Sequence, residues 1–353
     1  MWNAECGICE GEVFLPERRI SAKDGIRKDI LFLDGSGGDV MDIYCIGEIV
    51  VDFLPGEGGD VYIRNFGGAP ANVAVAAARN GLDAGVCCKV GDDDFGSFLE
   101  DTLKKENVRV LCRQRTQKAV TTMAFVTLGT DGERSFTFVR KPGADMFLSP
   151  EDVREGDVES ALIVHGGSCS LSAEPSAAAT VKALKLAKAS DRIVSFDVNY
   201  RELMWNGRKE KCAAAVKGLF PYIDILKISE EEADMFKGED NLPAVLKEYG
   251  LRAIVLTLGS RGAVCYYNEG KISAGGRKVP AADTTGAGDA FWGAFLSSLV
   301  IQGTRSCADI TPSVLKNALE YGNAAGALSV MGKGAVSSMP CRAQIVKELA
   351  GRT

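Results

Sequence analysis

The sequence has 353 residues, of which 46% are hydrophobic and 25% are charged. That balance is typical of a folded chain with a sizeable core, and it excludes disorder as the state of the whole chain. The net charge of -6 does not favour non-specific binding to nucleic acid, so we expect no such partner.

Residues 1–40 differ from the rest of the chain. They carry scattered charges and the Gly-rich patch 35–38, and no helical or strand periodicity persists through them. An apolar run begins abruptly at Met41. We therefore predict a loosely ordered extension over residues 1–40, a folded domain over 41–345 and a short tail over 346–353.

The sequence carries no membrane or secretion signal. No charge-free apolar stretch approaches the roughly 18 residues that a transmembrane helix needs, and the first residues lack the apolar centre of a signal peptide. The 11 cysteines lie mostly in apolar runs, as reduced thiols do. The pair Cys6 and Cys9 has no second pair at zinc-ligand spacing. We expect a cytoplasmic protein without membrane contact.

Strands and helices alternate from Met41 onward. We expect strands from 43 and at 86–90, 162–165, 193–198, 223–228 and 253–258, and helices at 73–80, 95–106, 177–189, 290–301 and 315–330. This alternation predicts an α/β fold in which helices flank a doubly wound, mostly parallel sheet.

Two β-like runs, 121–128 and 134–140, do not fit that alternation. Asp131-Gly132 between them supplies the left-handed positions that a tight hairpin requires. We expect segments near 60–66 and 120–141 to form a small antiparallel sheet at the edge of the main one.

The strongest motif runs from Asp283 to Asp289 and directly precedes an apolar helix. Gly286, Ala287 and Gly288 allow a tight turn and a close approach of a phosphate to the backbone, and a helix N-terminus favours an anion. Asp289 would repel that anion, which is useful only if the acid accepts the proton of an attacking hydroxyl. The alternative is that Asp289 merely caps the helix.

Three weaker motifs each have a structural alternative. Asn65 to Asn72 places a Gly-Gly turn before a helix, and Asn72 offers both a donor and an acceptor to a polyol. Asp197 to Arg201 follows an apolar strand, where ligands bind in open α/β sheets. Thr257 to Gly262 is a turn suited to pass under a nucleotide. Taken singly, each motif also has a purely structural interpretation. The first is an ordinary turn before a helix, the second a solvated strand end and the third a common loop.

Other catalytic templates are missing from the sequence. There is no P-loop motif, and no strand leads into the Gly-rich motif of dinucleotide binding. The single histidine, His165, excludes a histidine-based metal cluster and argues against serine-hydrolase chemistry. His165 ends an expected strand, where it either contacts a substrate or packs in the core.

Taken together, Phe66–Ala74 and Asp283–Phe291 resemble the two signatures of the ribokinase-like carbohydrate kinases. The resemblance extends over about residues 42–341. Within that family, 47–52, 138–145 and 226–232 are similar to stretches of fructokinases.

The sequence departs from the family pattern in two places. Ser229 stands where the Asn-x-x-Glu motif has its asparagine. Gly167 and Cys169 depart from the sequence that fructokinases usually have after this histidine, His165. The second departure bears on the sugar and leaves the kinase assignment intact.

The resemblance implies an α/β domain with a β lid over the sugar and a role for each of several residues. The sugar would be bound by Asp52, Gly68, Asn72, Arg140 and His165. The nucleotide site would include Asn199, Glu232, Thr257, Gly259, Gly262 and Asn323, with Glu232 supporting a Mg²⁺ ion held through the phosphates. Gly286, Ala287 and Gly288 would form the anion hole, Asp289 would be the base, and Asp283, Thr285 and Gly334 would lie near a monovalent cation such as K⁺.

The activity implied by the resemblance is transfer of the γ-phosphoryl group of ATP to a sugar hydroxyl, most closely fructose to fructose 6-phosphate. A ribose or 2-keto-3-deoxygluconate kinase and a catalytically silent regulatory protein on the same fold are the alternatives. Intact Asp289, Gly286 and Gly288 favour a kinase over the silent protein. Lid sheets in this family can pair, so a homodimer through the lid is also implied.

Overall fold

The computed structural model describes residues 40–56, 61–112, 114–128 and 134–351, together with two short strands nearer the N-terminus. The chain divides into two compact units, residues 1–39 and 40–353. In the first unit, β1 (Val13–Leu15) pairs antiparallel with β2 (Arg18–Ile20). The rest of the predicted extension lies outside the described residues, as does the turn expected at Asp131-Gly132.

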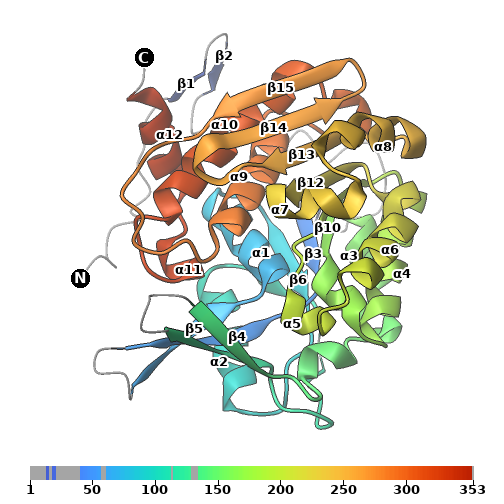
Figure 1. The fold of residues 1–353 in the computed structure, drawn as a ribbon, viewed down its shortest axis with the longest axis vertical. Helices are drawn as coiled ribbons and strands as arrows, with labels where there is room; N and C mark the ends of the chain where they lie inside the picture. The colour runs from blue at the N-terminus through green and yellow to red at the C-terminus, as the bar shows by residue number, and fades with distance from the viewer. Residues whose placement is uncertain are drawn as a thin grey trace. The chain divides into compact units, whose positions relative to one another are not determined.

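The described part of the second unit is built around a nine-stranded sheet (Figure 1). In spatial order its strands are β15 (Gly270–Gly275), β14 (Gly262–Tyr267), β13 (Ala253–Thr257), β12 (Ile225–Ser229), β11 (Ile193–Asp197), β10 (Ala161–Gly167), β3 (Met41–Ile46), β6 (Ala84–Cys87) and β7 (Arg109–Val110). The strands from β13 to β7 pair in parallel, whereas β14 and β15 add antiparallel at one edge. The predicted fold class is confirmed, and the hairpin of β14 and β15 is an addition to it.

Helices follow most of these strands. They are α1 (Ala69–Arg79), α2 (Asp94–Lys105), α3 (Glu155–Glu159), α4 (Ser176–Ala189), α5 (Glu202–Trp205), α6 (Lys209–Leu219), α7 (Glu230–Ala233), α8 (Leu242–Tyr249), α9 (Ala287–Ile301), α10 (Pro312–Ser329), α11 (Ala335–Ser338) and α12 (Arg342–Ala350). The helix expected at 73–80 begins earlier, at Ala69, because Pro70 suits a first helical turn. No described helix has the length and apolar character that crossing a membrane requires.

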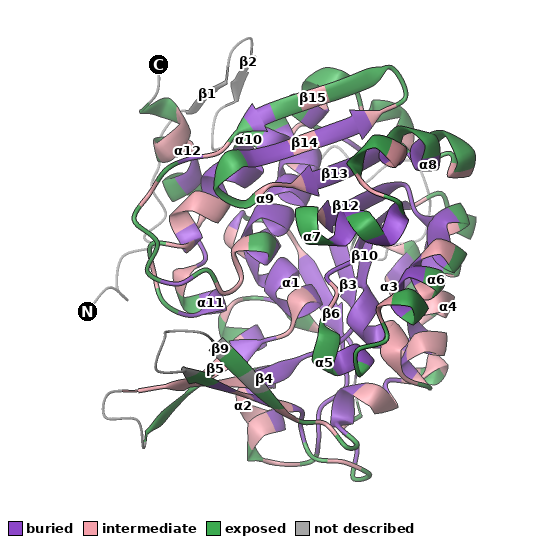
Figure 2. Ribbon diagram, viewed as in Figure 1, coloured by how far each residue is buried: buried purple, intermediate pink, exposed green. Residues whose placement is uncertain are grey.

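The sheet separates two layers of apolar core. Along β3, Ile43 and Cys45 belong to the layer that contains α1, α9 and α10, while Tyr44 and Ile46 belong to the layer that contains α4 and α6. This alternation is the period of a strand that is buried on both faces. Figure 2 shows the central strands buried over nearly all of their length, whereas the outer sides of several helices and the β15 edge of the sheet are exposed.

A second, four-stranded sheet lies below the main one in the view of Figure 1. Its order is β5 (Tyr62–Gly67), β4 (Val50–Pro55), β8 (Met123–Leu128) and β9 (Arg134–Val139). The predicted small sheet at the edge of the main one did not include β4. It was also expected to be antiparallel throughout, whereas β4 pairs in parallel with β8. We call this sheet the lid.

Candidate functional site

The turn before α9 has the geometry that the sequence motif predicted. Gly286 has φ +76°, and a Cβ on it would lie 2.6 Å from Cβ of Ala335, so this position requires glycine. Helix α9 begins at Ala287, which places Gly288 and Asp289 in its first turn. Backbone amides of a first turn have no partner within the helix. The amide of Ala287 donates to the carbonyl of Thr284 over 3.2 Å, so the amides of Gly286 and Gly288 are the ones best suited to bind an anion.

Asp289 is only 7% exposed and accepts a hydrogen bond of 2.8 Å at Oδ2 from Nδ2 of Asn72. Burial raises the pKa of this carboxyl to about 6, although the Asn72 hydrogen bond and the charges of Arg201 and Lys227 lower it. A carboxyl with this pKa is ionised at neutral pH yet basic enough to accept a proton. Asp289 therefore meets the requirements of a general base.

Asn72 brings an unsatisfied polar atom to the region of Asp289, and Asp52 brings a second carboxyl. Oδ1 of Asn72 is buried and has no hydrogen-bond partner among the described residues. Asp52 lies on β4 of the lid, and a Cβ on Gly67 would lie 2.2 Å from its Oδ2. Burial raises the pKa of Asp52 to about 7, Arg201 lowers it, and Asp289 raises it further. An orphan acceptor beside two carboxyls is suited to a ligand rich in hydroxyl groups.

The Gly-Gly turn fits closely against the end of β3. Gly68 has φ +109°, and a Cβ there would lie 2.6 Å from the carbonyl oxygen of Glu48. Oε1 of Glu48 accepts a 3.3 Å hydrogen bond from the Ala69 amide, and Oε2 is buried without a partner. Burial raises the pKa of Glu48 to about 7. Sequence reasoning gave Glu48 no role, and its place directly after a buried strand was the available signal.

A second charged network lies on β11 and β12. Nζ of Lys227 lies 2.7 Å from Oδ2 of Asp197, and the two residues are directly paired in the parallel register. Glu232 accepts at Oε1 from the amide of Tyr200 over 2.6 Å and at Oε2 from the amide of Ser229 over 2.8 Å. Sequence reasoning missed Lys227, although a lysine inside an apolar strand is itself a signal.

The other predicted residues of the Asp197–Arg201 segment, Asn199 and Arg201, lie beyond the end of β11. Asn199 is 8% exposed and has a left-handed backbone with φ 37°. Arg201 is exposed, and its charge lowers the pKa of both Asp52 and Asp289. Arg201 belongs to the predicted motif, but the prediction assigned it no separate role. Its guanidinium is a cation that acts on both carboxyls.

Four of the residues predicted for the nucleotide site lie at or against the β13–β15 edge: Thr257, Gly259, Gly262 and Asn323. Thr257 Oγ1 donates to the carbonyl of Ile228 over 3.3 Å, and Nδ2 of Asn323 donates to the carbonyl of Ala274 over 2.9 Å. A Cβ on Gly262 would lie 2.1 Å from that same Ala274 oxygen, whereas Gly259 faces open space. Gly262 and Asn323 thus hold β15 in place, and their contact with a nucleotide stays a prediction.

The three residues predicted for a monovalent cation do come together. Oδ1 of Asp283 accepts from the amide and the hydroxyl of Thr285, over 2.9 and 2.7 Å. Oδ2 of Asp283 accepts from the amide of Gly334 over 2.9 Å. These contacts join the loop before α9 to the loop before α11.

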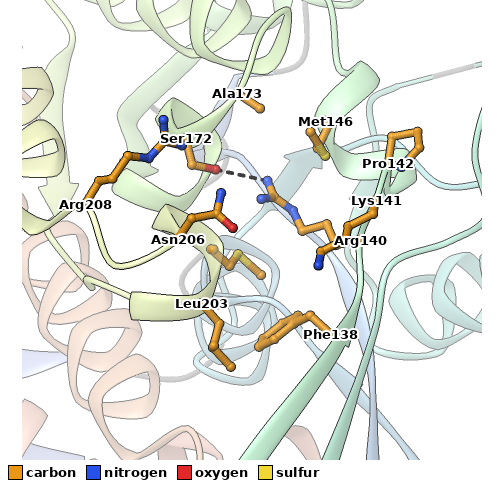
Figure 3. A pocket seen from close by; sticks show the side chains of 11 residues that line it. Phe138, Arg140, Lys141, Pro142, Met146, Ser172, Ala173, Leu203, Asn206 and Arg208 are labelled. Atoms are coloured by element: carbon orange, nitrogen blue, oxygen red, sulfur yellow. Dashed lines mark hydrogen bonds between the residues drawn. The ribbon is translucent and has the colours of Figure 1, made fainter.

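Arg140 follows the last lid strand and is nearly buried. It pairs with Asp145 at 2.8 Å and donates to the hydroxyl of Ser172 over 3.2 Å. A cavity of about 390 Å³ opens beside it, lined also by Phe138 of the lid and Leu203 of α5 (Figure 3). Of the residues predicted to bind sugar, Arg140 is the one that lines this cavity.

His165 belongs to the core. It lies within β10 at 1% exposure, and its Nδ1 is 3.0 Å from the hydroxyl of Ser195, which also accepts from the indole of Trp292 over 3.0 Å. Burial lowers the pKa of His165 to about 4, so the imidazole is neutral. The structure favours the packing alternative over the predicted sugar contact.

Known proteins resemble this chain over most of its length. The family model described as pfkB family carbohydrate kinase matches residues 42–342. Fructokinase-1 of Oryza sativa subsp. japonica is 36% identical over 315 residues, which cover 86% of this chain and 96% of the rice protein.

Solved structures agree in fold. The fructokinase of Xylella fastidiosa with bound ATP has a TM-score of 0.82 and 30% identity over 88% of this chain and 98% of its own. The Vibrio cholerae O395 double mutant, in its form with fructose, ADP and potassium ion, has a TM-score of 0.79 and 32% identity over 88% and 99% of the two chains. The family match and these similarities, spanning nearly all of the described second unit, establish that the chain belongs to the pfkB family of carbohydrate kinases.

Proposed function

We propose that this carbohydrate kinase transfers the γ-phosphoryl group of ATP to a hydroxyl of fructose, giving fructose 6-phosphate. The observation that carries the proposal is the buried pair of Asn72 and Asp289, joined at 2.8 Å with the other oxygen of Asn72 left without a partner. A sugar hydroxyl that donates to that oxygen would lie within reach of the Asp289 carboxylate.

Each group has a separate task in the reaction. Asp289 accepts the proton as the sugar oxygen attacks the γ-phosphorus, and the bond from that phosphorus to the bridging oxygen of ADP breaks. The amides of the segment 286–288 stabilise charge on the phosphoryl oxygens. Asp52 and Gly68 hold the sugar, and the lid, which carries Asp52, excludes water.

The charged network suits a phosphate-bound Mg²⁺ ion. One carboxylate oxygen of Asp197 is buried and has no partner among the described residues, so it is a candidate to bind the hydrated ion. Glu232 is close enough to interact electrostatically with Asp197 and adds a second acidic group. Bound Mg²⁺ would neutralise phosphate charge. We propose further that Asp283, Thr285 and Gly334 support a K⁺ ion beside the anion hole.

The choice of fructose rests on relatives. The rice relative and both bacterial structures are fructokinases. Aminoimidazole riboside kinase of Salmonella enterica is also similar, with 28% identity and a TM-score of 0.76, so ribosides belong in any substrate screen.

Two further proposals concern the protein as a whole. Exposed apolar side chains at Val61, Tyr62 and Ile63 on and beside β5 support a homodimer formed through the lid. We also propose a cytoplasmic location. Sedimentation of the purified protein and fractionation of the source cells test these two proposals.

The test of function is a coupled assay of ADP release across fructose, ribose, 2-keto-3-deoxygluconate, tagatose and nucleosides. We expect the highest kcat/KM with fructose, because a site that reads hydroxyls rejects acceptors that leave its polar groups unpaired. A preference of about tenfold or more for another acceptor would overturn the fructose assignment, a discrimination well within reach of such a site. No sugar-dependent ADP release with any acceptor would favour the catalytically silent alternative.

A further inference from the structure

Lys227 is a cation in the interior of a parallel sheet. It lies on β12, whose neighbours Leu226 and Ile228 are fully buried, and it is itself 5% exposed. Burial alone lowers the pKa of Lys227, but the charges of Asp197 and Glu232 raise it above the ordinary value, so the ammonium is protonated. A buried charge of this kind costs free energy unless partners compensate it.

Stability does not explain why the charge is there. Its ion pair with Asp197 is well formed at 2.7 Å, with side chains 7% and 2% exposed. A buried ion pair, however, is often no more stable than apolar residues of the same volume. The strand is apolar on either side of Lys227, so an apolar residue at this position would fit its surroundings. This points to a role for the ammonium beyond neutralising Asp197.

The ammonium is directed at the candidate anion hole. Nζ of Lys227 lies 3.6 Å from the position that a Cβ on Gly288 would occupy, and it is the nearest side-chain atom there. An ammonium has three donors, and Asp197 takes one of them. The charge of Lys227 also lowers the pKa of Asp289. Lys227 therefore faces the same space as the first turn of α9.

We propose that Lys227 is a catalytic residue that contacts the transferring phosphoryl group of the nucleotide, donating from Nζ to a non-bridging oxygen of the γ-phosphate. This inference rests on the proposed kinase function. Lys227 stays protonated throughout: the sugar proton goes to Asp289, and the electron pair of the broken bond leaves with ADP. A fixed cation at this point stabilises charge that spreads over the phosphoryl oxygens in the transition state.

Lys89 offers a matched control. Its side chain is also 7% exposed, and its Nζ lies 2.6 Å from Oδ1 of Asp152. Lys89 belongs to none of the candidate sites. Replacing either lysine by methionine therefore removes a buried, paired ammonium while keeping the length of the side chain.

The experiment compares Lys227→Met with Lys89→Met and the parent protein. We expect kcat with ATP and fructose to fall about 10²–10³-fold in Lys227→Met, as when one donor of an anion hole is removed. Lys89→Met should stay within about threefold of the parent, far from that loss. Equal losses in both variants, or turnover of Lys227→Met within about threefold of the parent, would overturn the proposal.

Nucleotide affinity provides a readout that a purely structural lysine would not move. Binding of β,γ-methylene-ATP, which has a γ-phosphate, should weaken about tenfold in Lys227→Met, in line with loss of one charged hydrogen bond. Binding of ADP should change little. If both nucleotides weaken equally, Lys227 shapes the site without contacting the γ-phosphate, and the proposal is wrong.

Two features keep this test decisive. If Lys227→Met does not fold, the double variant Asp197→Asn/Lys227→Met replaces it, because it leaves no unpaired buried charge. Its control is Asp197→Asn alone. The double variant should bind β,γ-methylene-ATP no better than ADP, and a preference equal to that of Asp197→Asn would refute the contact. The binding measurements need no sugar. They therefore test the contact between Lys227 and the γ-phosphate even if the substrate screen contradicts the proposed function.

Discussion

Asn72 on α1 and Asp289 on α9 are 217 residues apart in the sequence and are joined by a buried hydrogen bond of 2.8 Å. The two helices pack against each other, with Val73 and Ala76 of α1 so close to Gly293 of α9 that a Cβ there would lie 2.3 Å from Cβ of Ala76. Helix packing thus fixes the distance between the residue proposed to hold the sugar and the proposed base.

Asp289→Asn should separate catalysis from stability. The amide keeps the size of the side chain but cannot accept the hydroxyl proton, so kcat should fall about 10²–10⁴-fold while KM for ATP changes little. Single-turnover phosphorylation measures this loss. A folded Asp289→Asn variant with turnover within about threefold of the parent would contradict the role of base.

The same variant tests the helix-cap alternative through its melting temperature. Burial raises the pKa of Asp289 from 3.8 to about 6, so the native state loses stability as pH rises through that window. Removing the charge should therefore leave the melting temperature above pH 6 unchanged or higher. A cap would instead lose up to about 1 kcal/mol with near-normal turnover of the folded fraction.

A protein that begins at Met41 should fold and turn over nearly as the full chain does. Residues 1–40 show no core periodicity, and the chain from Val40 onward forms a compact unit by itself. Melting temperature and kcat of the shortened protein measure this. Insolubility, or loss of most activity, would mean that the extension contributes to the fold.

Potassium should raise kcat above the rate in sodium or Tris alone. The expected site is the cluster of Asp283, Thr285 and Gly334, which connects the loop before α9 to the loop before α11. Asp283→Asn should abolish the response to potassium. Equal rates with and without potassium in the parent protein would remove this cation site.

Much of the fold follows from local sequence pattern, because buried strands and amphipathic helices alternate from Met41 onward. Asp289 was identifiable for the same reason: its Gly-rich turn and helix are contiguous in the chain. The lid strand β4 was harder to recognise. Residues 41–55 form one nearly continuous β-like run, and the chain leaves the main sheet at Gly47, which has φ 149°.

Lys227 could not be assigned from the sequence because its role depends on strand order. Its partner Asp197 becomes a neighbour only when β11 and β12 pair side by side, and Gly288 approaches from an element some sixty residues further along the chain. His165 illustrates the converse. A polar residue at an expected strand end suggested a ligand contact, but β10 continues to Gly167 and buries the imidazole.

The acid limb of the pH profile of kcat/KM should report the ionisation of Asp289. The parent protein should lose activity as pH falls through about 6, because the protonated carboxyl cannot accept the hydroxyl proton. Asn72→Leu removes the hydrogen bond that favours the ionised form, so the pKa of Asp289 should rise and the limb should move to higher pH. Asp52→Asn is the control: the pKa of Asp52 is about 7, so this carboxyl is largely protonated near pH 6 and its replacement should leave the limb in place. A limb that stays in place in Asn72→Leu would mean that another group controls the profile.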